Sequence, residues 1–295
     1  MGTTTGIAWT DRTWGPWTGC HKVSLGCREC YMFREKKRYG QDPNVVIRSK
    51  PNTFNAPLNR RKWSSDRPLV FVCSWSDFFI EEADPWRDET WAIIDARRDL
   101  IFQILTKRIE RAEGRLPWTR GNAWPHVWGV VSAENQATAN ERIPILLKAD
   151  FAVRGVSYEP AIGPVDFTAV RYRDDLAECR WNTLTGDHWV DNSMSPDAYA
   201  GPEDGVTRLD WLIIGGESAD RCDDARPFDL AWARTTIAQC RKAGVACFVK
   251  QLGARPFEIH KGNRRRLDLL ARKGDDPSEW ADDLRVFELP RGVRT

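Results

Sequence analysis

Three cysteines stand close together near the start of the chain, in the stretch TGCHKVSLGCRECY at residues 18–31. Six residues separate Cys20 from Cys27, and two residues separate Cys27 from Cys30. Thiolates at such short spacings are typical ligands of zinc and of iron–sulfur clusters. We expect a cytoplasmic protein, in which thiols stay reduced. Clustered cysteines there indicate metal binding or catalysis more than disulfides.

Two kinds of metal centre fit these thiols, and the residues alone leave both open. Structural zinc usually takes four protein ligands, so His21 or Cys73 would have to complete the set, and His21 is awkwardly close to Cys20. A catalytic zinc with three protein ligands and a water is a further option, although three thiolates make zinc a poor Lewis acid. A [4Fe–4S] cluster held by Cys20, Cys27 and Cys30 would leave one iron for a non-protein ligand.

A second set of polar residues follows apolar stretches later in the chain. The stretches VVSAEN, GVSYEP and IIGGES each place a carboxylate after small residues. Two further apolar runs end in other polar side chains. The candidate site residues in these endings are Ser132, Glu134, Ser157, Glu159, Gly215, Gly216 and Glu217, and then Ser74, Ser76, Asp77, Lys107 and Arg108.

These endings would meet if the apolar runs are parallel strands of one barrel, because barrel enzymes build their active sites at the carboxyl ends of the strands. We then expect Glu134, Glu159 and Glu217 to face a common cavity, where unpaired carboxylates would repel one another and attract a proton, a cation or a ligand donor. For any single strand, the alternative is that the polar residue caps the next helix.

The hydrophobic pattern supports such a sheet. Apolar runs alternate with helical patterns, which is typical of a parallel sheet covered by helices. The expected strands are 6–10, 68–77, 100–108, 126–135, 151–160, 209–218 and 244–253. The expected helices are 84–99, 137–149 and 229–244, the last ending at Gly244 as a helix C-cap.

Length and composition set limits on function. The chain has 295 residues and a net charge of only +2, so an anionic partner would have to bind a local basic patch. Basic runs at 34–40, 59–62 and 263–266 are either solvated surface or phosphate contacts. No apolar run reaches the roughly 20 residues of a membrane span, and no signal peptide is evident. We therefore expect a cytoplasmic protein without membrane contact.

The stretch 166–207 interrupts the strand and helix rhythm and is rich in polar and turn residues. We expect it to be an irregular insertion in a single domain that spans residues 1–295. Long loops of this kind are usually functional or disordered. The insertion is therefore either a lid over the strand ends or a surface excursion.

The motifs resemble those of a known family. WTDRTWGPWTGCHKVSLGCRECY, LTKRIERA, WGVVSAENQATANERIPILLKA, VSYEPAIGPVDF and the long stretch that begins IIGGESADRCDDARPF occur in the order found in the phage Gp37/Gp68 family, also called DUF5131 or three-Cys-motif proteins. That family is similar to the radical SAM enzymes. The resemblance implies an α/β fold with a partial or full (β/α) TIM-like barrel of the radical SAM type.

The resemblance also implies a cofactor set. Radical SAM enzymes hold a [4Fe–4S] cluster with three cysteines, and S-adenosyl-L-methionine binds the open iron. Reductive cleavage then gives a 5'-deoxyadenosyl radical. In this chain Cys20, Cys27 and Cys30 would ligate the iron, and an electron donor would be needed.

Carried over to the other candidates, the resemblance makes Asp77, Lys107 and Arg108 partners of the cofactor's charged ends. Glu134, Glu159 and Glu217 become hydrogen-bond acceptors or acid–base groups. The sequence departs from the usual pattern in its six-residue first gap, in Glu29 before the third cysteine, and in having no Gly-Gly-Glu after the second strand. Tyr31 would supply the missing aromatic contact, and the serines and glycines at the strand ends would complete the pocket.

The sequence does not name the substrate, although the phage setting that the resemblance implies suggests a nucleotide or a nucleic acid. A phage protein would act in the host cytoplasm. The competing hypothesis is a non-enzymatic zinc or iron–sulfur protein that binds nucleic acid. That alternative gives no role to three converging glutamates, which would repel a phosphate ligand.

Overall fold

The computed structural model describes residues 5–63, 68–173, 178–192, 195–201, 207–219 and 224–291. The chain divides into two compact units. The first unit comprises Met1–Val131 with Ala149–Val153, and the second comprises Ser132–Lys148 with Arg154–Thr295.

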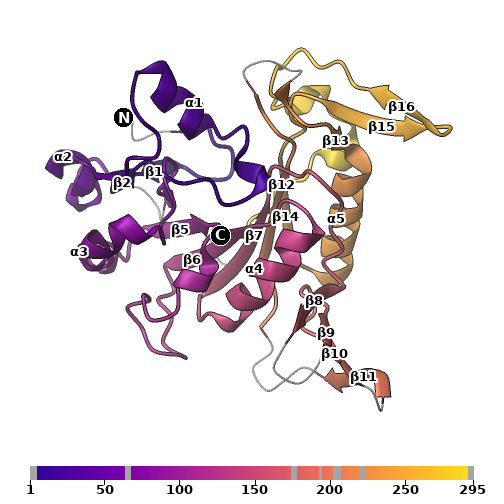
Figure 1. The fold of residues 1–295 in the computed structure, drawn as a ribbon, viewed down its shortest axis with the longest axis horizontal. Coiled ribbons are helices and arrows are strands. Elements are labelled where there is room, and N and C mark those ends of the chain that lie inside the picture. The colour runs from indigo at the N-terminus through magenta and orange to yellow at the C-terminus, as the bar shows by residue number, and fades with distance from the viewer. Residues whose placement is uncertain are drawn as a thin grey trace. The chain divides into compact units, whose positions relative to one another are not determined.

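The largest sheet is parallel (Figure 1), and its strand order is β1-β4-β5-β6-β7-β12-β14. The first four strands belong to the first unit and the last three to the second, but for one boundary residue each at β6 and β7. The strands are β1 (Arg12–Trp14), β4 (Leu69–Val72), β5 (Ile101–Thr106), β6 (Val127–Ser132), β7 (Val153–Tyr158), β12 (Trp211–Gly215) and β14 (Ala246–Gln251). This mixed α/β architecture is consistent with a partial (β/α) barrel.

Six of the seven expected strands are confirmed. The pairs β4–β5, β5–β6, β7–β12 and β12–β14 are all parallel. Their side chains are buried almost throughout, which explains why each run reads as continuously apolar rather than alternating.

The prediction of a strand at 6–10 is wrong. The first strand is β1, two residues later, and it pairs with β4 in the register Arg12↔Val70. Residues 7–10 form a turn in which the Thr10 N–H donates to the Ile7 carbonyl. Trp9 is buried by packing against Phe71, with ring centroids 5.0 Å apart, so its apolar character does not need a strand.

The described part of the chain contains five α-helices: α1 (Tyr31–Arg38), α2 (Pro51–Phe54), α3 (Asp84–Asp95), α4 (Gln136–Lys148) and α5 (Leu230–Ala243). The last three confirm the helical patterns. The Asp229 side chain caps the start of α5, and Gly244 ends it at φ 68°, as predicted. Short 3-10 helices cover Leu25–Cys27, Ala56–Leu58, Glu81–Ala83, Ile109–Arg111, Pro277–Glu279 and Asp282–Leu284.

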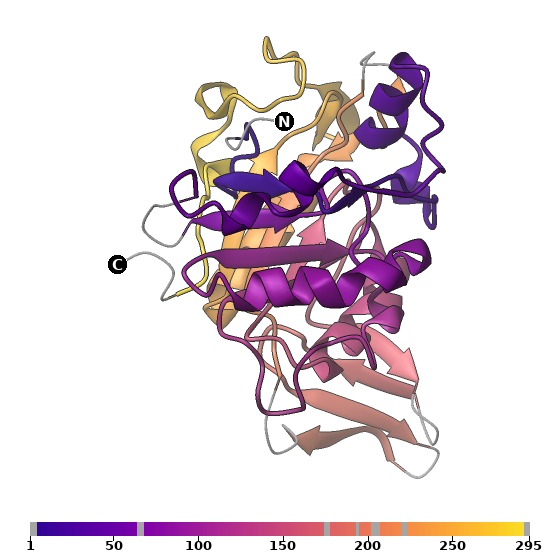
Figure 2. The same ribbon diagram turned by 90° about the vertical axis from the view of Figure 1, so that its left-hand side faces the viewer.

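The segment expected to be an irregular insertion contains an antiparallel sheet, seen at the bottom of Figure 2. Its order is β11-β10-β9-β8, with β8 at Val170–Arg173, β9 at Glu178–Trp181, β10 at His188–Asn192 and β11 at Ser195–Gly201. Cross-strand aromatic packing stabilises it, since the Tyr172 and Trp181 ring centroids lie 5.6 Å apart. Strands this short and polar carry little hydrophobic pattern.

Two small sheets complete the fold: β2 (Trp17–Thr18) with β3 (Ile47–Arg48), and β13 (Phe228–Asp229) with β15 (Pro256–His260) and β16 (Asn263–Arg266). Trp14, Trp17, Trp128 and Trp211 are among the largest fully buried side chains. Among the described residues, no helix is long and apolar enough to cross a membrane.

Candidate functional site

The cysteine loop connects β2 to α1 in the first unit. Cys27 ends the 3-10 helix Leu25–Cys27, and Cys30 is the N-cap residue of α1. Backbone hydrogen bonds fix the loop at each cysteine, because the Cys20 N–H donates to Pro43 and the Cys27 N–H donates to Ser24. The three cysteines are therefore held on one short stretch of backbone.

The start of the loop is fixed by Gly19, which has φ +101°. A Cβ atom at this position would lie 2.2 Å from the Val45 carbonyl oxygen, so only glycine fits. The Gly19 N–H donates to Trp75, and the Ser76 hydroxyl donates to the Gly19 carbonyl at 2.5 Å. Residues that follow β4 thus hold Cys20 in place.

Asp77 and Arg108 form the polar centre next to Cys20. The Asp77 carboxylate accepts hydrogen bonds from the Thr106 hydroxyl at 2.7 Å and from the Lys107 backbone N–H at 2.8 Å. Arg108 Nη1 lies 3.3 Å from Asp77 Oδ2 and 3.6 Å from the Cys20 sulfur. Both charged side chains are buried. Asp77 and Arg108, predicted as separate cofactor contacts, are partners of each other.

Burial and the nearby Asp77 carboxylate together raise the pKa of Cys20 to about 12, although the charge and hydrogen bond of Arg108 oppose them. Burial also raises the pKa of Cys73 well above its usual value. Both thiols are therefore protonated at neutral pH. A metal ion that binds Cys20 would have to displace its proton, and the Arg108 guanidinium would then stabilise the sulfur's negative charge.

The donor chemistry of this loop suits iron or zinc, because one loop carries three thiols. One of them, Cys20, contacts the buried Arg108 guanidinium. The sulfur atoms are not arranged as a ligand set. Among the residues that the structure describes, no group of three or more His, Cys, Asp or Glu side chains is placed to hold a metal ion. Occupancy would require the loop to bring its thiols closer together.

Tyr31, Ser74 and Ser76 lie around the same loop. The Tyr31 hydroxyl donates a short hydrogen bond to the Ser74 carbonyl, which places the first residue of α1 beside the segment after β4. The ring remains partly exposed. Of the candidates from the sequence, the first unit thus brings together the three cysteines, Tyr31, Ser74, Ser76, Asp77, Lys107 and Arg108.

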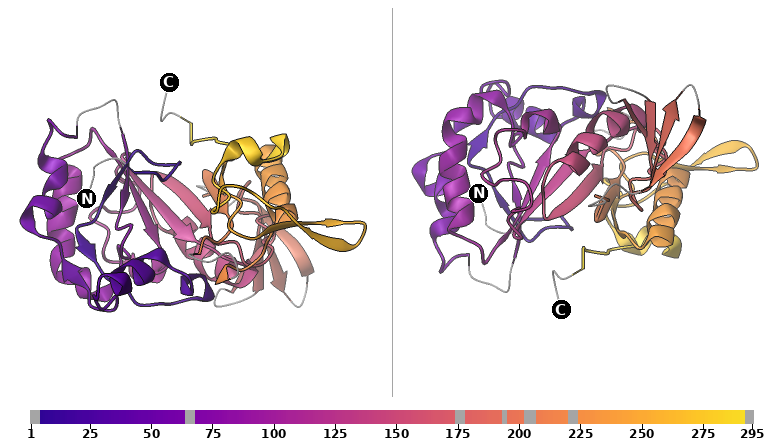
Figure 3. Two further views of the ribbon diagram at one scale, coloured as in Figure 1. Left: turned by 90° about the horizontal axis from the view of Figure 1, so that it is seen from above. Right: turned by 90° about the horizontal axis from the view of Figure 1, so that it is seen from below.

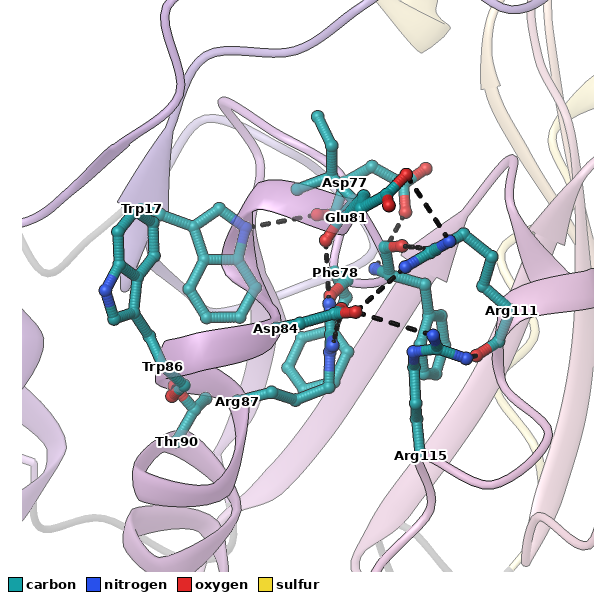
Figure 4. A network of polar contacts seen from close by, with 12 residues as sticks. Trp17, Asp77, Phe78, Glu81, Asp84, Trp86, Arg87, Thr90, Arg111 and Arg115 are labelled. Atoms are coloured by element: carbon teal, nitrogen blue, oxygen red, sulfur yellow. Dashed lines mark hydrogen bonds and ion pairs between the residues drawn. The ribbon is translucent and has the colours of Figure 1, made fainter.

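A network of arginines holds the segment that carries Asp77 (Figure 4). Arg87, Arg111 and Arg115 all bind the Asp84 carboxylate. Arg87 also donates to the Phe78 and Ile80 carbonyls, and Arg111 donates to the Phe79 carbonyl. The network fixes residues 77–84 as they leave β4, and so positions the Asp77 side chain.

The remaining candidates belong to the second unit. Each glutamate there has a cationic partner of its own. Glu134 pairs with Arg142 of α4 at 3.1 Å, and both side chains are almost completely buried. Glu217 accepts from the backbone N–H and the guanidinium of Arg226. Because the carboxylates are neutralised separately, the expected repulsion among unpaired charges is absent.

Glu159 is the most accessible of the three, with 16% of its side chain exposed, and it lies 2.5 Å from Lys250 Nζ. Its carboxylate carbon would lie 3.3 Å from a Cβ atom on Gly215. The pair Glu159–Lys250 therefore lies at the carboxyl ends of β7, β12 and β14. Of the second unit's acidic candidates, it is the one best placed to meet a ligand.

The other second-unit candidates have structural roles. A Cβ atom on Gly216 would lie 2.4 Å from the Leu252 carbonyl oxygen, so glycine allows β12 and the end of β14 to approach. The Gln251 amide donates to the Gly216 carbonyl at 2.8 Å. Ser132 and Ser157 are buried, at 1% and 2% exposure.

A family model described as "Protein of unknown function (DUF5131)" matches residues 4–276. The chain belongs to this family. No curated protein matched the chain, and no solved structure did. The expected membership of DUF5131 is thus confirmed, whereas the phage Gp37/Gp68 name and the relation to radical SAM enzymes stay predictions.

Two arginines that pair with the candidate glutamates were not predicted from sequence. Arg142 follows Glu134 by eight residues and Arg226 follows Glu217 by nine, separations that no motif marks. Cys73 is buried with φ 61°, a left-handed conformation that is rare outside glycine. His21 lies 2.5 Å from Glu82. A polar residue at the end of an apolar strand is a usable signal, and Lys250 in β14 fits it.

Proposed function

We propose that this DUF5131 protein holds a [4Fe–4S] cluster through Cys20, Cys27 and Cys30 and acts as a radical SAM-like enzyme. The carrying observation is the loop itself: three thiols lie between β2 and α1, next to a buried Arg108 that contacts the Cys20 sulfur at 3.6 Å. When bound, such a cluster supplies the electron that cleaves S-adenosylmethionine into methionine and a 5'-deoxyadenosyl radical.

The chain's own residues would bind and orient the cofactor. Arg108 stabilises the thiolate of Cys20, and Asp77 holds Arg108 through their 3.3 Å ion pair. The partly exposed Tyr31 ring offers an apolar surface for an adenine. In the second unit, the Glu159–Lys250 pair offers an acceptor and a donor to a polar ligand. The substrate in this proposal is a nucleotide or a nucleic acid.

Anaerobic reconstitution with iron and sulfide tests the proposal. We expect about four irons per chain and a brown protein, and we expect Cys27→Ala to lose both. Cys179→Ala is the matched control, since Cys179 is a buried thiol of β9 far from the loop in sequence. Dithionite-reduced protein should then release 5'-deoxyadenosine from S-adenosylmethionine. Cluster binding without this product would contradict the enzymatic part alone.

A zinc centre is the second candidate, favoured by one observation. Cys73 is buried, and its pKa responds to the charge of Cys20, so a fourth thiol lies near the loop. A structural zinc protein that binds nucleic acid would use it. Stoichiometric zinc with no iron uptake, abolished by Cys73→Gly, would favour this function, whereas the cluster proposal expects Cys73→Gly to keep its iron. Glycine suits the φ of 61° at this position.

A further inference from the structure

The hairpin formed by β15 and β16 is a basic, solvent-exposed ribbon at the far end of the second unit's own elements (Figures 1 and 3). All residues from 259 to 266 are exposed. Lys261 and Gly262 form the turn with φ 48° and 79°, which suits a tight two-residue hairpin turn. The proposed function leaves this hairpin without a role.

The pairing register assigns the hairpin side chains to two faces. Directly opposed residues of an antiparallel pair point to the same side. One face carries Phe257 with Arg266 and Ile259 with Arg264, and the other carries Glu258 with Arg265 and His260 with Asn263. Glu258 lies 3.8 Å from Arg234 of α5, so the second face is the one turned toward α5. We call the first face the outer face.

The outer face is built to present guanidinium groups. The Arg264 guanidinium lies over the Phe257 ring, 3.6 Å from its centroid. Stacking orders the guanidinium while leaving its N–H edge available, which reduces the entropy lost on binding an anion. Arg266 has an acid nearby, Asp268 at 3.7 Å, but that carboxylate is 93% exposed and the pair contributes little.

Arg265 differs from its two neighbours in its surroundings. It lies across from Glu258, an acidic side chain that also pairs with Arg234. Arg265 therefore has an acidic neighbour across the hairpin, on the face turned toward α5. Arg264 and Arg266 instead lie across from Ile259 and Phe257. The positive charge of the hairpin is concentrated on the outer face.

We propose that the outer face of the β15–β16 hairpin binds the phosphate backbone of duplex DNA. Arginine forks match phosphate geometry, and a two-stranded ribbon fits the major groove of B-form DNA. A membrane surface is less suited, because Ile259 is the one strongly exposed apolar side chain among the described hairpin residues. With a net charge of only +2, the whole chain supplies no general attraction, so binding depends on this patch.

Fluorescence anisotropy with a labelled 20-base-pair duplex tests the proposal at several salt concentrations. The double variant R264Q/R266Q should bind at least about tenfold more weakly in low salt. The slope of log affinity against log salt should become shallower by about 2, since each lost phosphate contact removes roughly 0.9.

Matched controls separate the outer face from general charge. Arg265→Gln removes a charge from the same hairpin but from the other face, and should weaken binding by less than about threefold. R60Q/R61Q removes two charges from another basic run, at 59–62, and should leave the affinity within about twofold of the parent protein. Cys27→Ala should bind the duplex normally, because this inference does not depend on the cluster.

Other outcomes would overturn the proposal. Equal weakening by R60Q/R61Q and R264Q/R266Q would mean that charge acts without a defined surface. Tighter binding to vesicles with about one-third anionic lipid than to the duplex would assign the face to membranes. Tighter binding to single-stranded DNA of the same length would exclude seating in a duplex groove. Circular dichroism of each variant checks that it remains folded.

Discussion

At the scale of single residues, burial decides what each charged pair contributes. The Glu134 and Arg142 side chains are 0% and 3% exposed, whereas those of Glu159 and Lys250 are 16% and 24% exposed. Removing one member of a buried pair leaves an uncompensated charge in a low-dielectric interior. A pair that reaches water loses much less, because solvent takes over the role of the missing partner.

We therefore predict that Glu134→Gln destabilises the protein by about 3 kcal/mol, because Arg142 stays buried and charged. Glu159→Gln should cost about 1 kcal/mol or less. Urea unfolding followed by circular dichroism measures both variants under one set of conditions. Equal costs would show that the burial difference between the two pairs does not govern their stability.

At the scale of elements, the conformation of the cysteine loop depends on how closely its backbone approaches Val45 and Val46, just before β3. Gly19 sits under the Val45 carbonyl at a φ of +101°, whereas Gly40, just after α1, has φ +67° and no atom within 4 Å of a built Cβ. Both positions favour glycine by conformation. Only at Gly19 would a Cβ atom also collide with neighbouring backbone. Comparing the two positions therefore separates the cost of the left-handed conformation from the cost of the collision.

The substitution Gly40→Ala should cost about 1 kcal/mol, which is the usual penalty for a left-handed alanine. Gly19→Ala should cost roughly 3 kcal/mol or more, because the backbone must also move away from Val45. The displaced loop should take up less metal during reconstitution. Thermal unfolding and metal analysis of both variants check this, and similar results for the two would contradict a tightly packed loop.

At the scale of the whole molecule, 44 basic and 42 acidic residues nearly balance, so stability depends on how the charges are paired. Hydrogen bonds from Arg97 lower the pKa of Asp99. Burial raises the pKa of Asp84, but hydrogen bonds and charge from Arg87 and Arg115 outweigh it and leave the value lowered. Folding therefore favours the ionised form of both carboxyls.

The lowered pKa values of these two carboxyls set the direction in which stability changes with pH. Ionised Asp84 and Asp99 stabilise the folded state above the unfolded carboxyl pKa of about 4, and this stabilisation is lost as the pH falls through that value toward the lower folded pKa. We predict that the free energy of unfolding decreases from pH 6 to pH 3.5. Asp84→Asn should be less stable than the parent protein by roughly 1 kcal/mol at pH 6.

The difference between the parent protein and Asp84→Asn should narrow as the pH falls, because the parent loses the same ion pairs by protonation. Urea unfolding at four pH values between 3.5 and 6 measures it. A constant difference across that range would mean that Asp84 stabilises through contacts that do not depend on its charge.

Local sequence patterns were enough to predict the strands β4 to β7, β12 and β14, the helices α3 to α5 and the position of the cysteine loop. Strands buried on both faces must be continuously apolar, and helix ends must satisfy their backbone groups, so both leave marks within a few residues. The thiol spacing is equally local. These features could be predicted because the physical demand and the residue that meets it are neighbours along the chain.

The partners of the polar and charged side chains could be identified from the three-dimensional structure but not from the sequence. Lys250 reaches Glu159 across 91 residues, and Arg108 reaches Asp77 across the 3-10 helix Glu81–Ala83, α3 and β5. A polar residue at a strand end indicates that a polar partner is needed, but it does not indicate which residue that partner is. The short polar strands β8 to β11 were missed for the same reason, since their stability comes from cross-strand contacts rather than from a pattern of their own. Such pairings depend on proximity in space, which a linear pattern does not record.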